Sequence, residues 1–376
     1  MVEWKKMWEV TTWDKKFSGV DKYMQPRVIK YHYYLANELS ELERLDGDIR
    51  ILYTTDKISY ADSNEVMENI SEGEVVAIPW GGNVTIKYYN GKFVTADNRI
   101  ATSNNKGILS NKYLYYWMIS QKEEIGKFYR GAGIKHPSML SVLSMDIPIP
   151  LLSEQNRIVG ILDTFTASIE NLKEQIAKRR KQFEHYRDQL LDLEVKEGVE
   201  MNSVAHFVKE RILANELTAQ NYTSVENLLK DKAGRKDAEN VPSEGSWIRS
   251  QRGDVLIGNI RPYLRKIWLS DREGGTNGDV IVIRANDALF PEFMFYCLAS
   301  ESFFLYYNQA LKDGKMPRGE KNRVLSYVIP SIRKEEQSRI VSILDTFEAS
   351  IANLEAQLSQ REKQYEYYRN KLLTFE

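Results

Sequence analysis

Apolar side chains recur at alternating spacings of four and three residues along two long stretches, from Ile158 to Leu193 and from Ile340 to Phe375. This is the pattern of the buried seam in a two-stranded coiled coil. The first stretch contains no Gly or Pro after Gly160, and the second contains none at all. Each is therefore expected to form a single helix of about 36 residues, roughly 50 Å long. The seam positions that carry this prediction are Ile158, Leu162, Phe165, Ile169, Leu172 and Ile176 in the first stretch and Ile340, Leu344, Phe347, Ile351, Leu354 and Leu358 in the second.

The two stretches are copies of each other. When the sequence is shifted by 182 positions, residues 151–192 match residues 333–374 at 24 of 42 positions without a gap. This self-similarity predicts two copies of one structural unit, each a globular part followed by a long helix. Each copy has one polar seam residue, Arg179 or Arg361, and an arginine there would specify register at a cost in stability. The simplest arrangement buries the two seams against each other within one chain.

The regions before the helices have related but more divergent patterns. Each contains a turn with Gly and an acidic residue, a short buried strand, a loop, an aromatic-rich strand, a third strand and a Tyr- and Phe-rich helical stretch. We therefore predict an α+β fold class, in which two pseudo-repeated mixed α/β domains are joined by two long helices that form an antiparallel coiled coil. The expected divisions are 1–152 and 199–332 for the globular domains and 153–198 and 333–376 for the helices.

Composition adds little evidence about partners. Lys and Arg number 52 against 53 Asp and Glu, and the resulting net charge of −1 gives no global signal for nucleic acid. The globular regions are balanced as well, with 19 basic and 19 acidic residues in 1–150 and 18 and 16 in 201–332. The single cysteine, Cys297, cannot form an internal disulfide, and there is no apolar run of membrane-spanning length. We expect a soluble, cytoplasmic protein that does not enter a membrane.

Basic and aromatic side chains gather on Gly-rich loops in both globular regions. In the second region five cations lie between Lys312 and Arg323, close to Gly314, Pro317 and Gly319. Lys and Arg on such loops suit DNA phosphates, and Arg and Asn can read base edges in the major groove. One basic loop is most often a solvated surface, but matching loops in both regions favour nucleic-acid binding. The candidate DNA-binding residues are Trp80, Asn83, Lys87, Arg130, Lys135 and His136 in the first region and Arg261, Tyr263, Arg265, Lys266, Lys312, Lys315, Arg318, Lys321 and Arg323 in the second.

No pattern of catalytic residues stands out. The sequence lacks the phosphate-binding pattern Gly-x-x-x-x-Gly-Lys-Ser/Thr and the nucleophile elbow Gly-x-Ser-x-Gly. Its four histidines are dispersed, and one cysteine cannot supply zinc-ligand spacing. Asp97 and Asp279 align between the copies, but both lie in turn sequences, where Asp stabilises the turn itself. We therefore expect no enzymatic activity, no metal site and no cofactor in this chain.

With these features, the chain resembles the DNA-specificity (HsdS) subunits of Type I restriction-modification systems over essentially its whole length. The most specific parts are Gln-x-Arg-Ile-Val-x-Ile-Leu-Asp-Thr-Phe at 155–165 and 337–347 and the Tyr-Arg-x-x-Leu-Leu endings at 186–191 and 368–373. The run RGDVLIGNIRPYLRKIW in the second region is similar to a target-recognition domain of this family. The first region carries less of the family pattern.

The resemblance implies a division of labour. Each globular domain would be a target-recognition domain that contacts one part of a bipartite double-stranded DNA sequence, and the helices would be the spacer between them, in a system for DNA methylation and phage defence. Such subunits bind two methyltransferase subunits, which carry S-adenosylmethionine, and restriction (motor-nuclease) subunits, which use ATP and magnesium. This chain would hold no catalytic residue. Its near-zero net charge predicts little affinity for DNA when it is alone.

The sequence also allows one function of another class. The chain could be a coiled-coil scaffold whose aromatic-rich domains bind proteins and not DNA. Reversing the charges of Lys315, Arg318 and Lys321 would discriminate the two hypotheses, because only DNA binding requires those cations.

Overall fold

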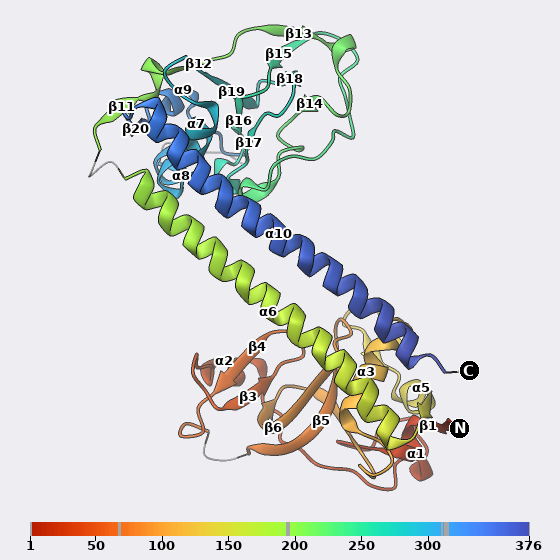
Figure 1. Cartoon of the computed structure of the whole chain (residues 1–376). Coiled ribbons are helices and arrows are strands. Elements are labelled where there is room, and N and C mark those ends of the chain that lie inside the picture. The colour runs from red at the N-terminus through yellow and green to blue at the C-terminus, as the bar shows by residue number, and fades with distance from the viewer. Residues whose placement is uncertain (1, 67–68, 193–195, 310, 312–315, 376) are drawn as a thin grey trace. The chain divides into compact units, whose positions relative to one another are not determined.

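The computed structural model of the chain describes residues 2–66, 69–192, 196–309, 311 and 316–375. Contacts between residues divide the chain into two units, one made of residues 1–172 and 357–376 and the other of residues 173–356. The architecture is mixed α/β with a pair of long helices (Figure 1). Each long helix has one half in each unit, so this division differs from the sequence-based one, which treats the helices as separate segments.

The two heptad stretches form the longest helices, α6 (Leu152–Leu190) and α10 (Lys334–Leu373), which contain 39 and 40 residues. Pro150 and Pro330 lie shortly before their first turns, where proline stops a helix from extending backwards. Glu154 lies in the first turn of α6, and two glutamates lie in that of α10, where the helix dipole favours negative charge. Among the described residues, no helix combines the length and the apolar composition of a membrane-spanning segment.

Within the first unit, the beginning of α6 packs against the end of α10. Ile158 and Leu162 share a buried cluster with Leu373, and the Phe165 ring stacks on Tyr368 with 5.3 Å between ring centroids. Residues further along α6 therefore meet residues further back in α10, so the two segments run in opposite directions. The Arg361 guanidinium lies 5.7 Å from the centroid of the Phe165 ring.

The two helices pack in the same way in the second unit, but there the end of α6 meets the beginning of α10. Phe183 and Leu190 of α6 pack on the cluster that contains Leu344 of α10, and the Tyr186 ring lies 5.4 Å from that of Phe347. Arg179 lies over the Phe347 ring, again at 5.7 Å. Six of the predicted seam residues are buried, and the other six are half-buried. The buried ones are Ile158, Leu162, Ile169, Ile176, Ile340 and Leu344, and the half-buried ones are Phe165, Leu172, Phe347, Ile351, Leu354 and Leu358.

The globular part of the first unit is built on a six-stranded sheet in the order β2-β7-β5-β6-β3-β4, in which only β3 and β6 are parallel. These strands are β2 (Thr11–Trp13), β3 (Ile49–Leu52), β4 (Ile58–Ala61), β5 (Ser71–Pro79), β6 (Lys87–Thr95) and β7 (Asn98–Ser103). Two antiparallel pairs complete it, β1 (Glu3–Lys6) with β10 (Asp146–Ile149) and β8 (Tyr129–Arg130) with β9 (His136–Pro137). Its helical segments are α1 (Met7–Val10), η1 (Lys22–Met24), α2 (Ala36–Glu41), α3 (Asn111–Ser120), α4 (Lys122–Lys127) and α5 (Met139–Leu143).

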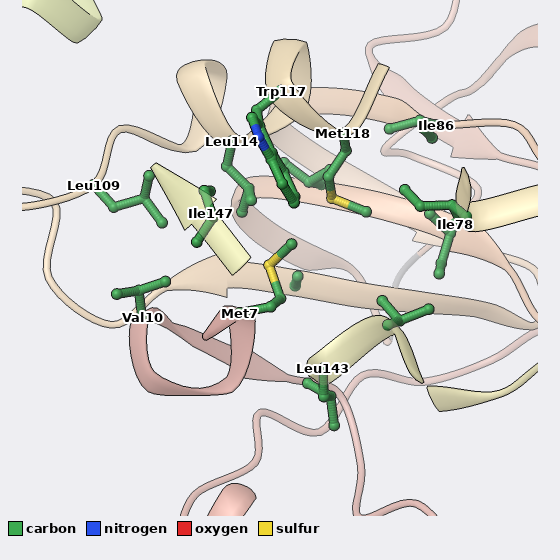
Figure 2. Close-up of a cluster of buried hydrophobic side chains, with 14 of the residues drawn as sticks. Met7, Val10, Ile78, Ile86, Leu109, Leu114, Trp117, Met118, Leu143 and Ile147 are labelled. Carbon is green, nitrogen blue, oxygen red and sulfur yellow. The ribbon is translucent and has the colours of Figure 1, made fainter. Parts of the chain in front are cut away.

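The main core of the first unit gathers side chains from α3, α5, β5 and β10. Figure 2 shows apolar side chains from these elements and from α1 pointing into one cluster. Because Ile158, Leu162 and Leu373 belong to the same cluster, the globular part and both helix segments share one core. The labelled members are Met7, Val10, Ile78, Ile86, Leu109, Leu114, Trp117, Met118, Leu143 and Ile147.

The second unit has two four-stranded sheets, in the orders β12-β19-β16-β17 and β13-β15-β18-β14. Its strands are β11 (Gly198–Glu200), β12 (Ala205–Phe207), β13 (Arg211–Leu213), β14 (Tyr222–Thr223), β15 (Ser246–Ser250), β16 (Val255–Gly258), β17 (Ile267–Leu269), β18 (Gly274–Thr276), β19 (Val280–Ala285) and β20 (Val328–Pro330). Its shorter helices are η2 (Met201–Ser203), η3 (Ala214–Glu216), η4 (Lys230–Lys232), η5 (Pro262–Leu264), α7 (Pro291–Leu298), α8 (Glu301–Asn308) and α9 (Lys321–Leu325). Strands β11 and β20 pair antiparallel, as β1 and β10 do in the first unit.

A buried glutamine ties α6 to the globular part of the first unit. The Gln155 side chain is fully buried, and its Oε1 accepts a hydrogen bond of 2.9 Å from the backbone N–H of Ser110, the N-cap residue of α3. Its Nε2 donates to the carbonyl oxygens of Ile108 (2.7 Å) and Pro150 (2.9 Å). One side chain thus satisfies three backbone groups that burial would otherwise leave without partners. We call this arrangement the first joint.

The second joint reproduces these three hydrogen bonds. Gln337 is buried, its Oε1 accepts from the N–H of Phe290, the N-cap residue of α7, and its Nε2 donates to the carbonyls of Ala288 and Ile332. The donor–acceptor distances are 2.9, 3.1 and 3.0 Å. The glutamine in the repeated helix motif therefore anchors the helix to its domain in both units.

A tyrosine–aspartate hydrogen bond supports each joint. The Tyr116 hydroxyl donates to Asp163 Oδ1 at 2.6 Å, and the Tyr296 hydroxyl donates to Asp345 Oδ1 at the same distance. Burial raises the pKa of both phenols, and each carboxylate acceptor raises it further. The aspartate of the repeated motif thus has the same acceptor role in both units.

Candidate nucleic-acid interface

In the first unit, the loop that follows β5 lies against the loop between β8 and β9. The backbone N–H of Gly82 donates to the Lys135 carbonyl at 3.0 Å, and His136 Nδ1 lies 2.8 Å from the Trp80 carbonyl oxygen. The Trp80 and His136 rings also pack, with 5.1 Å between centroids. Residues 80–87 and 129–136 therefore form one surface, which we call the first loop pair.

The second unit joins the matching loops in the same way. Arg261 N–H donates to the Pro317 carbonyl at 2.8 Å, and Gly319 N–H donates to the Asn259 carbonyl at 3.2 Å. An isolated antiparallel bridge between Ile260 and Arg318 strengthens the contact. Residues 259–266 and 316–321 form the second loop pair.

The two loop pairs share backbone hydrogen bonds at two matching positions. Trp80 N–H donates to the Asp97 carbonyl at 3.0 Å, and Asn259 N–H donates to the Asp279 carbonyl at 2.8 Å. These bonds align Trp80 with Asn259. Gly82 and Arg261, two residues further on, also make matching bonds to the other loop, so Gly82 corresponds to Arg261. The sequence predicted the basic clusters separately, and the structure brings the two clusters of each unit together.

The first loop pair exposes several of its predicted side chains. Asn83, Arg130, Lys135 and His136 are all exposed, and the Arg130 and Lys135 side chains have no ion pair with any described residue. Trp80 is half-buried. The surface thus offers two cations, an amide and an imidazole to a partner.

A buried arginine that the sequence did not indicate supports Trp80. The Arg99 guanidinium lies 4.1 Å from the centroid of the Trp80 ring, and its Nη1 donates to Asp97 Oδ1 at 2.8 Å. Only 3 % of Arg99 is exposed, which rules out direct contact with a large partner. The arginine within the short strand β7 was the available sequence signal. Arg99 and His136 flank the Trp80 ring, so the indole has a structural role in shaping the loop.

Two predicted lysines are turned inward, one in each unit. Lys87 Nζ donates to the Tyr53 carbonyl at 2.6 Å, and burial lowers its pKa to about 8. Lys266, at the matching position, donates to the Val225 carbonyl at 2.6 Å, and burial lowers its pKa as well. Both ammonium groups hold a neighbouring turn against the loop pair. The sequence predicted that they face DNA, whereas the structure commits them to internal carbonyls.

Most of the described cations of the second loop pair have internal partners. Arg265 donates to Asp231 and Glu301, both at 2.7 Å, and these carboxylates raise its pKa. Arg318 donates to Asp279 at 2.9 Å. Lys321 lies 4.6 Å from the centroid of the Phe207 ring.

Arg323, just beyond this loop pair, is also engaged. It donates to the Tyr306 carbonyl at 2.9 Å and stacks on that ring at 4.1 Å. Arg261 and Tyr263 differ, because neither side chain has a hydrogen bond or ion pair among the described residues, and Tyr263 is half-exposed. Lys312 and Lys315 lie outside the described residues.

A hollow of about 560 Å³ opens beside the first loop pair. Its walls include the exposed side chains of Asp56 and Asn83 together with Asp97 and His136. Carboxylate and amide oxygens can accept hydrogen bonds from the amino groups of bases. Among the described residues there is no cluster of three or more His, Cys, Asp or Glu side chains that could hold a metal ion.

In comparisons with known proteins, the chain is similar to subunits of one kind. Residues 14–179 match the family described as the Type I restriction modification DNA specificity domain. A Haemophilus influenzae protein that bears the name of a type I restriction enzyme specificity subunit is 26 % identical, over 86 % of this chain and 90 % of its own length. An Escherichia coli type I restriction enzyme specificity subunit is also 26 % identical, over 72 % of each chain.

The fold agrees with these relatives. The crystal structure of the S subunit of a Type I restriction-modification system from M. genitalium superposes with a TM-score of 0.63, covering 100 % of this chain and 97 % of that one at 15 % identity. Matching loop pairs, repeated joints and a pair of long helices occur together with the sequence matches. Residues 14–179 therefore match the DNA specificity domain of Type I restriction-modification systems, and the chain as a whole is similar to specificity subunits of type I restriction enzymes.

Proposed function

We propose that the chain is the sequence-specific DNA-binding subunit of a Type I restriction-modification system, in which each loop pair contacts one part of a bipartite double-stranded target. The observation that carries this proposal is the set of backbone hydrogen bonds shared by the loop pairs, which holds different side chains in the two units. Two domains with one scaffold and different surfaces suit two different short sequences. A fixed separation is needed because both half-sites must be reached at one helical phase of the duplex.

In this proposal the units are diverged copies, and α6 and α10 form an antiparallel coiled coil that acts as the spacer. The opposed direction of the helix segments within each unit supports it, as do the matching positions of Arg179 and Arg361 over phenylalanine rings. The target-recognition domains would comprise residues 1–152 and 199–332, with spacer helices in 153–198 and 333–376. The proposed DNA contacts are the exposed groups of the first loop pair together with Arg261, which is half-buried, and Tyr263 of the second.

The helices would also bind partner subunits. Arg157, Thr164 and Ala167 are exposed on α6, and the same residue types are exposed at 339, 346 and 349 on α10. Two similar exposed faces suit two copies of one partner, which we propose to be the methyltransferase subunit that carries S-adenosylmethionine. Restriction subunits that use ATP and magnesium would join this complex in the cytoplasm. The chain itself would contribute no catalytic residue and no cofactor.

Methylome sequencing tests the proposal directly. A host that carries the gene and its methyltransferase partner should show adenine methylation at a motif of two short specific sequences separated by an unspecific spacer. Deleting the gene should remove that motif and leave all other methylation unchanged. An adenine methylation pattern that is the same with and without the gene would contradict the proposal and favour a scaffold that binds only proteins.

A further inference from the structure

An arginine of the second loop pair, Arg261, occupies a strained backbone position. Arg261 has φ +50° and ψ +60°, the left-handed region that side chains other than glycine rarely adopt. Pro262 follows it, and a residue before proline normally prefers an extended conformation. The hydrogen bond from Arg261 N–H to the Pro317 carbonyl and the bridge between Ile260 and Arg318 hold the backbone in this state. Strain of this kind persists only where surrounding contacts enforce it, and it clusters at functional sites.

The first unit meets the same backbone requirement with a glycine. Gly82, which matches Arg261 through the shared hydrogen bonds, has φ +95°. A Cβ atom at Gly82 would meet no heavy atom within 4 Å, so the glycine is there for its backbone conformation and not for lack of space. The second unit therefore keeps an arginine where glycine would relieve the strain. This exchange indicates that the Arg261 side chain itself is needed.

A second arginine of the same turn, Arg265, differs because its side chain binds partners within the domain. Arg265 also has φ +50°, but its guanidinium is held by Asp231 and Glu301. The short helix η5 separates the two arginines. Arg265 thus fixes one end of η5 to the domain, while Arg261, at the other end, has no side-chain partner among the described residues.

We propose that Arg261 reads a guanine in the half-site bound by the second unit, and that Arg265 is the positioning residue that holds the turn for it. A planar guanidinium can donate two parallel hydrogen bonds to guanine O6 and N7 in the major groove, the most frequent specific contact between proteins and DNA. This inference rests on the proposed function, because it assumes that the loop pair faces DNA. It adds the identity of one recognised base and the residue that recognises it.

Binding by the complex of the chain with its methyltransferase subunits tests this inference. The target motif is taken from the methylome, and each guanine of the second half-site is replaced in turn by 7-deazaguanine, which lacks the N7 acceptor. At one position the replacement should weaken wild-type binding about ten-fold. Arg261→Gly should weaken binding to the unmodified target by a similar factor and should lose all sensitivity to the replacement. This variant suits the fold, because Gly82 occupies the matching position.

Three comparisons make the test decisive. Arg261→Lys keeps the charge without the planar fork, so it should retain affinity for random DNA and lose discrimination at that guanine. Methylation by the Arg261→Gly complex should become permissive at one base pair of the second half-site, with the first half-site unchanged as an internal control. Arg265→Ala should weaken binding while retaining partial sensitivity to 7-deazaguanine, since Arg261 is still present.

Two outcomes would overturn the proposal in different ways. If Arg261→Gly weakens target and random DNA equally, and no 7-deazaguanine affects the wild type, Arg261 contacts only phosphate and the proposed function stands without this inference. If the wild-type complex neither binds nor methylates a bipartite target, both the proposed function and the inference fail.

Discussion

The joints and the loop pairs differ in what the two units have in common. In the joints the side chains themselves agree, since Gln155 and Gln337 make the same three hydrogen bonds to matching backbone groups. In the loop pairs the backbone hydrogen bonds and the inward lysines Lys87 and Lys266 agree, whereas the side chain differs at the position of Gly82 and Arg261.

This difference explains the uneven self-similarity of the sequence. A joint needs a side chain of one size with both a donor and an acceptor, so it tolerates a single residue type. A loop held by backbone hydrogen bonds leaves its side chains free to vary, which is what two surfaces for two different sequences require. The residues of the repeated helix motif therefore attach the helices to the domains, and they do not determine what the domains recognise.

Replacing the joint glutamines should give the largest effect on stability. Gln155→Leu and Gln337→Leu each leave one backbone N–H and two carbonyls buried without partners, at a cost of about 2 to 4 kcal/mol. Hydrogen exchange resolves the two joints, because Gln155→Leu should speed amide exchange in α3 but not in α7, and Gln337→Leu should do the reverse. The exposed neighbours provide matched controls, Asn156→Ala and Ser338→Ala, which should change stability by less than about 0.5 kcal/mol. Unchanged exchange in α3 would show that the first joint is not required.

Charge reversal in the first loop pair should affect DNA binding and leave stability unchanged. Arg130→Glu combined with Lys135→Glu removes two exposed cations, and the complex with methyltransferase subunits should lose about 10- to 100-fold in affinity at physiological salt. The slope of log affinity against log salt should fall by about two, because each lost phosphate contact contributes about 0.9. Lys122→Glu, an exposed reversal at the start of α4, serves as the control. Unaltered binding by the double variant would favour the protein-scaffold alternative.

The long helices were predictable because their pattern persists over many turns. A heptad spacing repeated along both stretches leaves few alternatives, and the structure has α6 and α10 of 39 and 40 residues where about 36 were expected. The exact joint bonds were not predictable, because the carbonyl that Gln155 binds at Ile108 lies 47 residues away in sequence.

The sequence could not show which loop cations have internal partners, because those partners also lie far away along the chain. Arg265 is neutralised by Asp231, 34 residues earlier, and Lys87 binds a carbonyl 34 residues earlier in the chain. Local composition identifies where cations gather, whereas tertiary contacts decide which of them remain available. Arg261 and Arg130 remain available among the described residues, and the sequence could not distinguish them from Arg265.

The inward lysine of the first loop pair predicts a specific pH dependence. Burial lowers the pKa of Lys87 to about 8, whereas in the unfolded chain it remains near 10.5. Between these values the unfolded state binds more protons than the folded state, so stability should rise with pH in this window, by at most about 1.4 kcal/mol per pH unit. Denaturant unfolding from pH 7 to 10 should show the rise in the wild type but not in Lys87→Met. A difference between the two proteins that stays constant from pH 8 to 10 would contradict the assigned pKa.

The seam arginines should give the smallest change in stability, although they occupy equivalent positions in both helices. Each guanidinium lies over a phenylalanine ring of the facing helix at 5.7 Å, so a cation–π attraction of about 0.5 to 1 kcal/mol offsets part of its desolvation cost. Arg179→Leu and Arg361→Leu should therefore each change stability by less than about 0.5 kcal/mol. If these residues specify register, the double variant should form dimers or misaligned species that light scattering detects, whereas the wild type and both single variants stay uniform. A uniform double variant with a clearly raised melting temperature would show that the arginines oppose stability without providing specificity, unlike the joint glutamines.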